Sequence, residues 1–278
     1  MRKECGIPAF GSLGAYTYST IWTVISLVPL LWLVSLSFKT QSEWNGLPTM
    51  IPKHPTLVNY INAFANSPLP RFFSNSIIVS GGALVLSLAF GSIAAYVFAR
   101  KAFPLRRVLF YTIIAVRMIP ALLSIIPLYV IMYKINLLNT YTALIIAYMA
   151  TGIPVVTWIM KGFFESIPME LEEAAMLDGC SQLQIFYKII LPPAVPGLGA
   201  SAIFVFVRIW NEYIIALSLT STTVMRTLPV GIKNALGSRM ADYGSMAAYS
   251  VVAIIPIVIL FLCFQRYFVS GLTNGSVK

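Results

Sequence analysis

The chain has 278 residues, of which 58% are hydrophobic and 10% are charged, and its mean hydropathy is +0.83. A soluble globular protein is nearer half apolar and a quarter charged, so this composition excludes an ordinary soluble domain and indicates a membrane protein. The net charge of +10 would favour a nucleic-acid partner in a soluble chain. Here most basic residues flank apolar runs, where cations meet lipid headgroups, so we expect membrane lipid and no nucleic acid as a partner.

Six apolar runs predict six membrane-spanning helices, because a bilayer core takes roughly 20 apolar residues per helix. The predicted spans are residues 18–38, 73–99, 108–131, 142–160, 194–217 and 244–265. The first run is too long for a secretory signal and no small-residue cleavage site follows it, so we interpret it as an uncleaved span. The predicted fold class is an all-α membrane protein with a single transmembrane domain over residues 1–278.

Basic residues in the short loops predict the orientation of the chain. Arg100, Lys101, Arg106 and Arg107 crowd the connection between the second and third spans, whereas the next short connection carries only Lys134. The positive-inside rule places the first of these connections in the cytoplasm. With six spans, both termini are then expected in the cytoplasm.

Residues 161–193, between the fourth and fifth spans, form the most polar and acidic segment of the chain. They hold five of the nine acidic residues: Glu165, Glu170, Glu172, Glu173 and Asp178. Gly179 suits the left-handed residue that ends a helix, and Ser181 with Gln184 has the spacing of a capping box that starts another. We therefore predict a cytoplasmic helix–turn–helix element, which would either cap the bundle or dock into a cytosolic partner.

Several motifs resemble permeases of ATP-binding-cassette (ABC) importers. The EAA loop of that family is similar to Glu173-Ala174-Ala175, Asp178-Gly179, and Ile189 with Leu191-Pro192. Two further segments of this chain resemble the carbohydrate-uptake branch of the family. Its first outer loop is similar to Ile51-Pro52-Lys53-His54-Pro55-Thr56 with Asn59-Tyr60, and its fifth span is similar to Trp210-Asn211-Glu212. The tail, residues 266–278, resembles the closing segment of six-span maltose-type permeases, so the likeness covers nearly the whole chain.

This resemblance implies a transport complex in the inner (plasma) membrane of a prokaryote. A second, related permease subunit would complete the pathway, and two ATPase subunits would bind ATP and Mg²⁺. An extracellular solute-binding protein would deliver a sugar or oligosaccharide. The chain itself would then hold no cofactor and would not be an enzyme.

The resemblance also assigns residues to three surfaces. Coupling to the ATPase would use Glu173, Ala174, Ala175, Asp178, Gly179, Phe186, Leu191 and Pro192. The tail would dock on the ATPase through Phe268, Val269 and Leu272. The outer segment between the fifth and sixth spans would contact the binding protein through Gly231, Asn234, Gly237 and Tyr243.

Charged and polar side chains inside the predicted spans are the remaining candidates. Charge within a membrane span is costly and usually marks a functional pathway or a buried pair. Arg117 lies near a predicted span end, where it could also snorkel to the headgroups. Arg208 and Glu212 are four residues apart and, with Asn211 between them, could line a pathway or pair on one helix face.

Enzymatic functions find little support in the sequence. The chain has no Gly-x-x-x-x-Gly-Lys-Ser/Thr loop for ATP. Its single histidine, His54, leaves few residues from which a metal cluster or a His-dependent nucleophilic site could be built. Two alternatives to a sugar importer stay open: an ABC permease for another solute, and a secondary transporter. A secondary transporter would normally carry several carboxylates within its spans, where only Glu212 qualifies.

Overall fold

The computed structural model describes residues 9–236 and 242–274, which form helices and no strand. Four helices are long and apolar enough to cross a membrane, at Gly14–Ser37, Leu69–Arg100, Tyr141–Ser166 and Tyr243–Gln265. Two bent pairs, Arg106–Met118 with Leu122–Lys134 and Gln182–Ile190 with Val195–Trp210, raise the number to six if each pair is one span. The predicted all-α membrane fold is confirmed.

The described residues fall into two compact units. The first unit contains residues 9–67, 234–236 and 242–252, and the second contains residues 68–233 and 253–274. The expectation of one domain over the whole chain stays a prediction.

The first unit begins with α1 (Ala9–Ser37) and continues through two short helices, α2 (Gln41–Trp44) and α3 (Val58–Ala65). The loop that runs from the end of α1 to the start of α3 is held by side chains that bind backbone groups. Asn59 Nδ2 donates to the carbonyl oxygens of Ser37 and Lys39, at 2.9 and 2.8 Å. These bonds fix the path of the chain where it leaves the first span.

Glu43 organises the other end of this loop. Its carboxylate accepts hydrogen bonds from the backbone N–H groups of Lys53, at 3.0 Å, and His54, at 2.8 Å. Burial by itself raises the pKa of the Glu43 carboxyl, but these two N–H groups and the nearby charges of His54 and Lys39 outweigh it. The pKa therefore lies below its ordinary value of 4.5.

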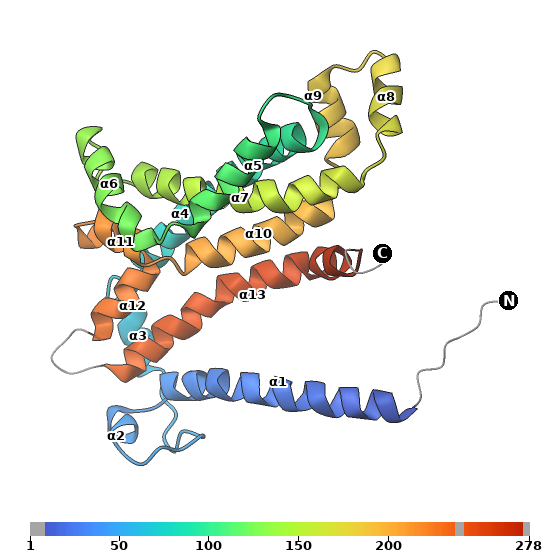
Figure 1. Cartoon of the computed structure of the whole chain (residues 1–278). Coiled ribbons are helices and arrows are strands. Elements are labelled where there is room, and N and C mark those ends of the chain that lie inside the picture. The colour runs from blue at the N-terminus through green and yellow to red at the C-terminus, as the bar shows by residue number, and fades with distance from the viewer. Residues whose placement is uncertain (1–8, 237–241, 275–278) are drawn as a thin grey trace. The chain divides into compact units, whose positions relative to one another are not determined.

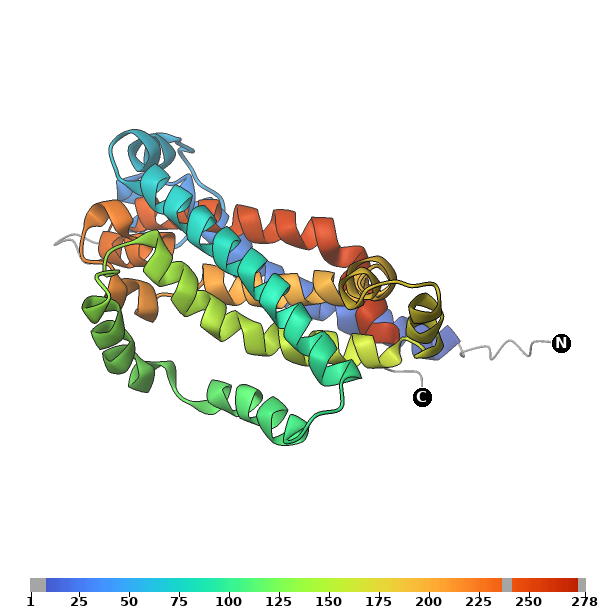
Figure 2. The same ribbon diagram turned by 90° about the horizontal axis from the view of Figure 1, so that it is seen from above.

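The second unit is built on α4 (Leu69–Arg100), α7 (Tyr141–Ser166) and α10 (Val195–Trp210), which pack side by side (Figure 2). Glycines bring α4 and α7 close together. A Cβ atom on Gly152 would lie 2.2 Å from Ser87 Oγ, and one on Gly91 would lie 2.6 Å from Val156 Cβ. Larger side chains at either glycine would force the two helices apart.

The predicted third span is broken, where the sequence led us to expect one helix over 108–131. It consists of α5 (Arg106–Ala115), the short turn η1 (Val116–Met118) and α6 (Ala121–Lys134), with a bend of 102° (Figure 2). Ile119, at φ −70° and ψ 122°, is extended because it precedes Pro120, whose ring disfavours a helical residue before it.

The predicted fourth, fifth and sixth spans differ from the observed helices at their ends. α7 continues to Ser166, so residues 161–166 belong to the span and not to the loop. The fifth span is interrupted, because α10 ends at Trp210 and α11 (Ile214–Leu219) begins four residues later. α13 (Tyr243–Asn274) runs well past the predicted end at 265.

The segment after α11 is tied to the start of α4 within the second unit. It contains the short turn η3 (Thr223–Met225) and α12 (Leu228–Leu236). Asn75 Nδ2 donates to the carbonyl oxygens of Val224 and Arg226, both at 2.8 Å, and Ser76 Oγ accepts from the Leu228 N–H at 2.8 Å. The described part of the connection expected at 218–243 is therefore partly helical, and residues 224–228 are firmly attached to α4.

The Glu43 contacts predict an acid-sensitive loop. The pKa of Glu43 is lower in the folded loop than in the unfolded chain. The ionised carboxylate therefore stabilises the folded loop at pH values above the pKa of Glu43 in the unfolded chain, and this stabilisation is lost as the pH falls through its pKa in the folded loop. Limited proteolysis within residues 44–56 should therefore accelerate in acid. Glu43→Gln should raise cleavage at neutral pH and flatten the pH dependence, and an unchanged profile in this variant would contradict the role of Glu43.

Candidate functional site

A helical hairpin connects α7 to α10 and projects beyond the ends of both helices (Figure 1). It consists of α8 (Glu170–Leu177), α9 (Gln182–Gln184) and η2 (Ile185–Ile190), a wider π-helical segment. The chain turns by 85° from the α9–η2 segment into α10. We call residues 170–190 the α8–η2 hairpin.

Local capping chemistry shapes the turn of the hairpin. Gly179 has the left-handed φ of 79° that the sequence predicts. The N–H of Cys180 bonds to the carbonyl of Ala175, and the N–H of Gly179 bonds to that of Met176, at 3.0 and 3.1 Å. This pair of bonds is the Schellman arrangement that ends a helix.

The second arm of the hairpin starts with the predicted capping box. Ser181 Oγ accepts from the Gln184 N–H at 3.4 Å, and Gln184 Oε1 accepts from the Ser181 N–H at 2.8 Å. The two reciprocal bonds satisfy donors that a helix start would otherwise leave free. Local sequence therefore determines where the first arm ends and where the second begins.

A buried ion pair attaches the hairpin to α4. Arg100 Nε lies 2.6 Å from Glu172 Oε1, and the two side chains are 7% and 1% exposed. Tyr96 OH donates to Glu172 Oε2 at 3.0 Å, and Arg100 Nη2 donates to the Ile167 carbonyl at 2.6 Å. Removing one partner of such a pair strands a buried charge, which costs about 3–5 kcal/mol.

Apolar side chains complete the attachment. The Phe186 ring lies 5.2 Å from that of Tyr96 and 6.2 Å from that of Phe164, centroid to centroid. Ala175 and Ile190 are also buried in this cluster. Phe186 and Ala175 were assigned to the coupling surface, but the structure turns both inward, where they hold the hairpin against the bundle.

The outer face of the hairpin carries most of the remaining predicted coupling residues. Exposed residues among those predicted are Glu173, Ala174, Asp178, Gly179 and Pro192, whereas Leu191 is partly buried. Leu177 and Leu183 lie on the same hairpin and are 89% and 74% exposed. An apolar surface with exposed acidic side chains is therefore available to a partner.

Glu212, within the fifth span, caps a half-helix. Its carboxylate accepts hydrogen bonds from the N–H groups of Ile215, at 2.9 and 3.1 Å, and Ala216, at 3.1 Å. Tyr148 OH donates to it at 2.9 Å. The N-terminus of α11 thus satisfies the negative charge. Of the two alternatives for Arg208 and Glu212, the pair on one helix face is not formed, because among the described residues no ion pair joins the two.

Two arginines line one cavity of about 210 Å³ beside this break. Arg208 lies in the last turn of α10, and Arg117 lies between α5 and α6 rather than near a span end as expected. Arg117 Nη1 donates to the Thr151 carbonyl at 3.4 Å. In the described part of the chain neither arginine has a carboxylate partner, so their charges face the cavity uncompensated.

The other predicted surfaces are only partly described. Gly231 is buried, and a Cβ atom there would lie 2.1 Å from Phe72 Cδ2, so this glycine serves packing and is wrong as a surface contact. Tyr243 is 45% exposed. Gly237 and the side chains of Asn234, Phe268, Val269 and Leu272 lie outside the described residues.

A bundle with interrupted spans and a hairpin fixed to its end is the architecture of a membrane subunit of a transport system. The chain belongs to the family of binding-protein-dependent transport system inner membrane components, whose family model matches residues 87–274. The resemblance seen in the sequence is thereby confirmed.

The similarity to individual relatives extends over nearly the whole chain. The sulfoquinovosyl glycerol transport system permease protein of Agrobacterium fabrum is 40% identical over 94% of this chain and 92% of its own length. The trehalose transport system permease protein of Mycobacterium tuberculosis is 38% identical over 94% and 98%. The fold resembles that of a chain in the crystal structure of a bacterial ABC transporter involved in the import of the acidic polysaccharide alginate. That match has a TM-score of 0.78 at 24% identity and covers 96% of this chain and 99% of that one.

The buried pair gives the first prediction for the hairpin. Glu172→Arg places two cations together inside the protein, so we expect at least a tenfold loss of transport by the assembled complex. Adding Arg100→Glu restores opposite charges and should recover a substantial part of the activity. Membrane-fraction blots establish that each variant is inserted.

Lys188→Glu is the matched control, because Lys188 is an exposed charged residue on the second arm of the same hairpin. It should change transport by much less than Glu172→Arg. Equal losses in the two single variants, or no recovery in the double variant, would show that the Arg100–Glu172 pair does not position the hairpin.

Proposed function

We propose that this chain is one permease subunit of an ATP-driven sugar importer and forms half of the translocation pathway. The observation that carries the proposal is the α8–η2 hairpin, fixed inwardly by Glu172 and Phe186 and open outwardly at Glu173, Leu177 and Asp178. The family match supports the class of protein. The relatives named for sulfoquinovosyl glycerol and trehalose support a sugar or oligosaccharide as cargo.

The hairpin would transmit movement from an ATPase to the spans. A partner shifts a conformational equilibrium only through contacts that differ between the two states. Contacts with the exposed face would move α8, and the Arg100–Glu172 pair would pass the displacement to α4. Because Phe186 joins the same cluster, the α9–η2 arm moves with α8 and carries the start of α10 with it.

The interrupted spans would line the pathway. Breaks at Pro120 and at residues 211–213 place Arg117, Arg208 and the Glu212-capped end of α11 beside one another. Transporters place substrate sites near such breaks, because polar backbone and charged groups are tolerated where they line a cavity. The second permease would close the other side of this pathway.

The remaining partners follow from the same proposal. Two ATPase subunits would bind the hairpin faces of the two permeases and would hold ATP and Mg²⁺, so this chain needs no cofactor. An extracellular binding protein would deliver the sugar near Tyr243. The tail beyond Arg266 would dock on an ATPase through Phe268, Val269 and Leu272.

A coupling test uses the complex assembled with its ATPases, the second permease and the binding protein. Glu173→Lys reverses an exposed charge of the coupling face, and Gly179→Val puts a β-branched residue at φ 79°, where a non-glycine costs about 1–2 kcal/mol. Both should abolish transport and reduce sugar-stimulated ATP hydrolysis at least tenfold, while the permease stays inserted. Gly179→Asn, which tolerates this conformation, should retain activity; full activity of Glu173→Lys and Gly179→Val would refute the proposed coupling role.

An orientation test uses single cysteines in intact cells. The proposal places the 101–107 connection and both termini in the cytoplasm, because basic residues concentrate in that short loop. A cysteine at 104 should be shielded from an impermeant thiol reagent, and a cysteine at 237 should be labelled. Reversed labelling would put the hairpin on the side without ATP and would contradict the proposal.

A further inference from the structure

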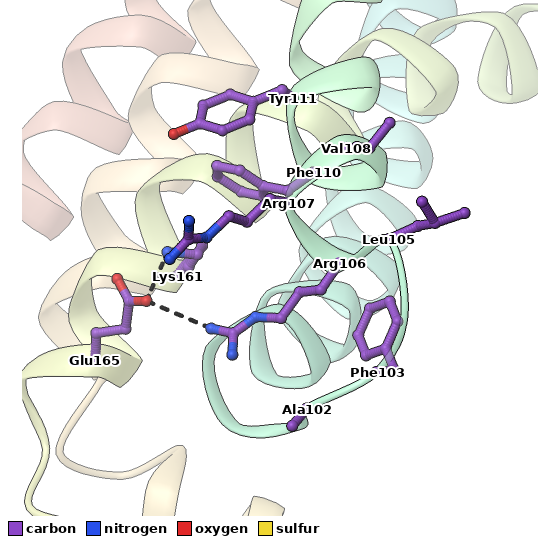
Figure 3. Close-up of a pocket in the computed structure, with 10 residues that line it drawn as sticks. All are labelled: Ala102, Phe103, Leu105, Arg106, Arg107, Val108, Phe110, Tyr111, Lys161 and Glu165. Atoms are coloured by element: carbon purple, nitrogen blue, oxygen red, sulfur yellow. Dashed lines mark hydrogen bonds and ion pairs between the residues drawn. The ribbon is translucent and has the colours of Figure 1, made fainter.

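A cationic cavity of about 610 Å³ lies at the end of the second unit that carries the hairpin. The loop after α4, the first turns of α5 and the last turns of α7 line it (Figure 3). Its charged side chains are Arg106, Arg107, Lys161 and Glu165. None of these four residues has a role in the coupling surface or the pathway proposed above.

The cavity keeps positive charge in excess. Glu165 Oε1 lies 2.6 Å from Lys161 Nζ and 3.8 Å from Arg106 Nη2, so one carboxylate is shared by two cations. Arg107 forms no ion pair among the described residues, and its guanidinium is turned toward the Lys161 side of the cavity (Figure 3). The three cationic side chains and the one carboxylate leave a net charge of +2 in the cavity. A negatively charged group such as a phosphate would neutralise this charge.

The start of α5 adds further donors. Its N-cap, Leu105, provides no side-chain hydrogen bond to the first turn. Uncapped N–H groups at a helix start carry partial positive charge and favour anions. The N–H of Arg106 bonds to the Phe103 carbonyl at 3.3 Å, so the N–H groups left uncapped belong to the next residues, Arg107 and Val108, which line the same cavity.

Exposed apolar side chains adjoin the charged ones. Leu105, Val108 and Tyr111 line the cavity and are 68%, 59% and 66% exposed. A soluble anion would gain nothing from this apolar surface. A phospholipid presents both chemistries together, a phosphate at the headgroup and acyl chains beside it, and basic sites at the cytoplasmic ends of spans suit such lipids.

We propose that this cavity binds the headgroup of an anionic phospholipid. The phosphate lies between Arg106, Arg107 and Lys161, and the acyl chains run along Val108 and Tyr111 on α5. Glu165 holds Lys161 and Arg106 in place and weakens the site by its own charge. The site is independent of the cargo, so its test does not depend on the transported solute.

Native mass spectrometry of the full chain, purified in detergent and titrated with cardiolipin, phosphatidylglycerol or phosphatidylcholine, measures this binding. Arg107→Gln should weaken cardiolipin binding about fivefold, because a cation near the membrane surface contributes about 1 kcal/mol. Glu165→Gln should tighten it, since it removes the only negative charge of the cavity lining. Arg107 is exposed and unpaired in the described structure, so its replacement leaves the packing intact.

Lys134→Gln is the matched control, because Lys134 is an exposed cation at the far end of the bent pair. It should leave the affinity unchanged. Equal losses for Arg107→Gln and Lys134→Gln, or no gain for Glu165→Gln, would mean that lipid binds by diffuse attraction and would overturn the site. Displacement of cardiolipin by inorganic phosphate at comparable concentration would overturn the lipid assignment and indicate a site for a soluble anion.

Discussion

The attachment of the α8–η2 hairpin to the membrane bundle depends on one buried ion pair, between Arg100 at the end of α4 and Glu172 on α8. Desolvating two charges makes such a pair a poor source of net stability, and an apolar pair of the same volume would often stabilise as well. The pair instead makes detachment costly, because separation would leave a charge buried. With Tyr96 and the Ile167 carbonyl as further partners, it fixes the hairpin in one position relative to α4.

The same principle governs the charge inside the fifth span. A carboxylate within a membrane is costly unless donors surround it, and Glu212 receives the free N–H groups of α11 and the Tyr148 hydroxyl. The helix break is therefore what makes the charge tolerable. In turn, the charge satisfies the backbone groups that the break releases. Broken helix and acidic residue depend on each other, so neither is a defect of the span.

Sequence reasoning predicted the features that neighbouring residues determine. The turn at Gly179 and the capping box of Ser181 with Gln184 are local, because their donors and acceptors lie within a few residues. The inward orientation of Glu172 was not predicted. Glu172 and its neighbour Glu173 have the same side chain, and which of them is buried depends on which face of α8 is covered by α4. The helix break at residues 211–213 was not predicted, because no proline marks it in the sequence. The burial of Gly231 was not predicted either, because it depends on Phe72, more than 150 positions away.

Arg117 and Arg208 show where a single chain is incomplete. Both line a cavity within the spans, and in the described residues no carboxylate pairs with either. Charge at membrane depth costs several kcal/mol when it faces lipid, so a bundle that keeps two such arginines must face them toward water or toward groups outside this chain. The proposed half of a pathway meets that condition, because a second permease would enclose the cavity and keep it aqueous. The uncompensated charges are therefore consistent with a subunit that functions only in a pair.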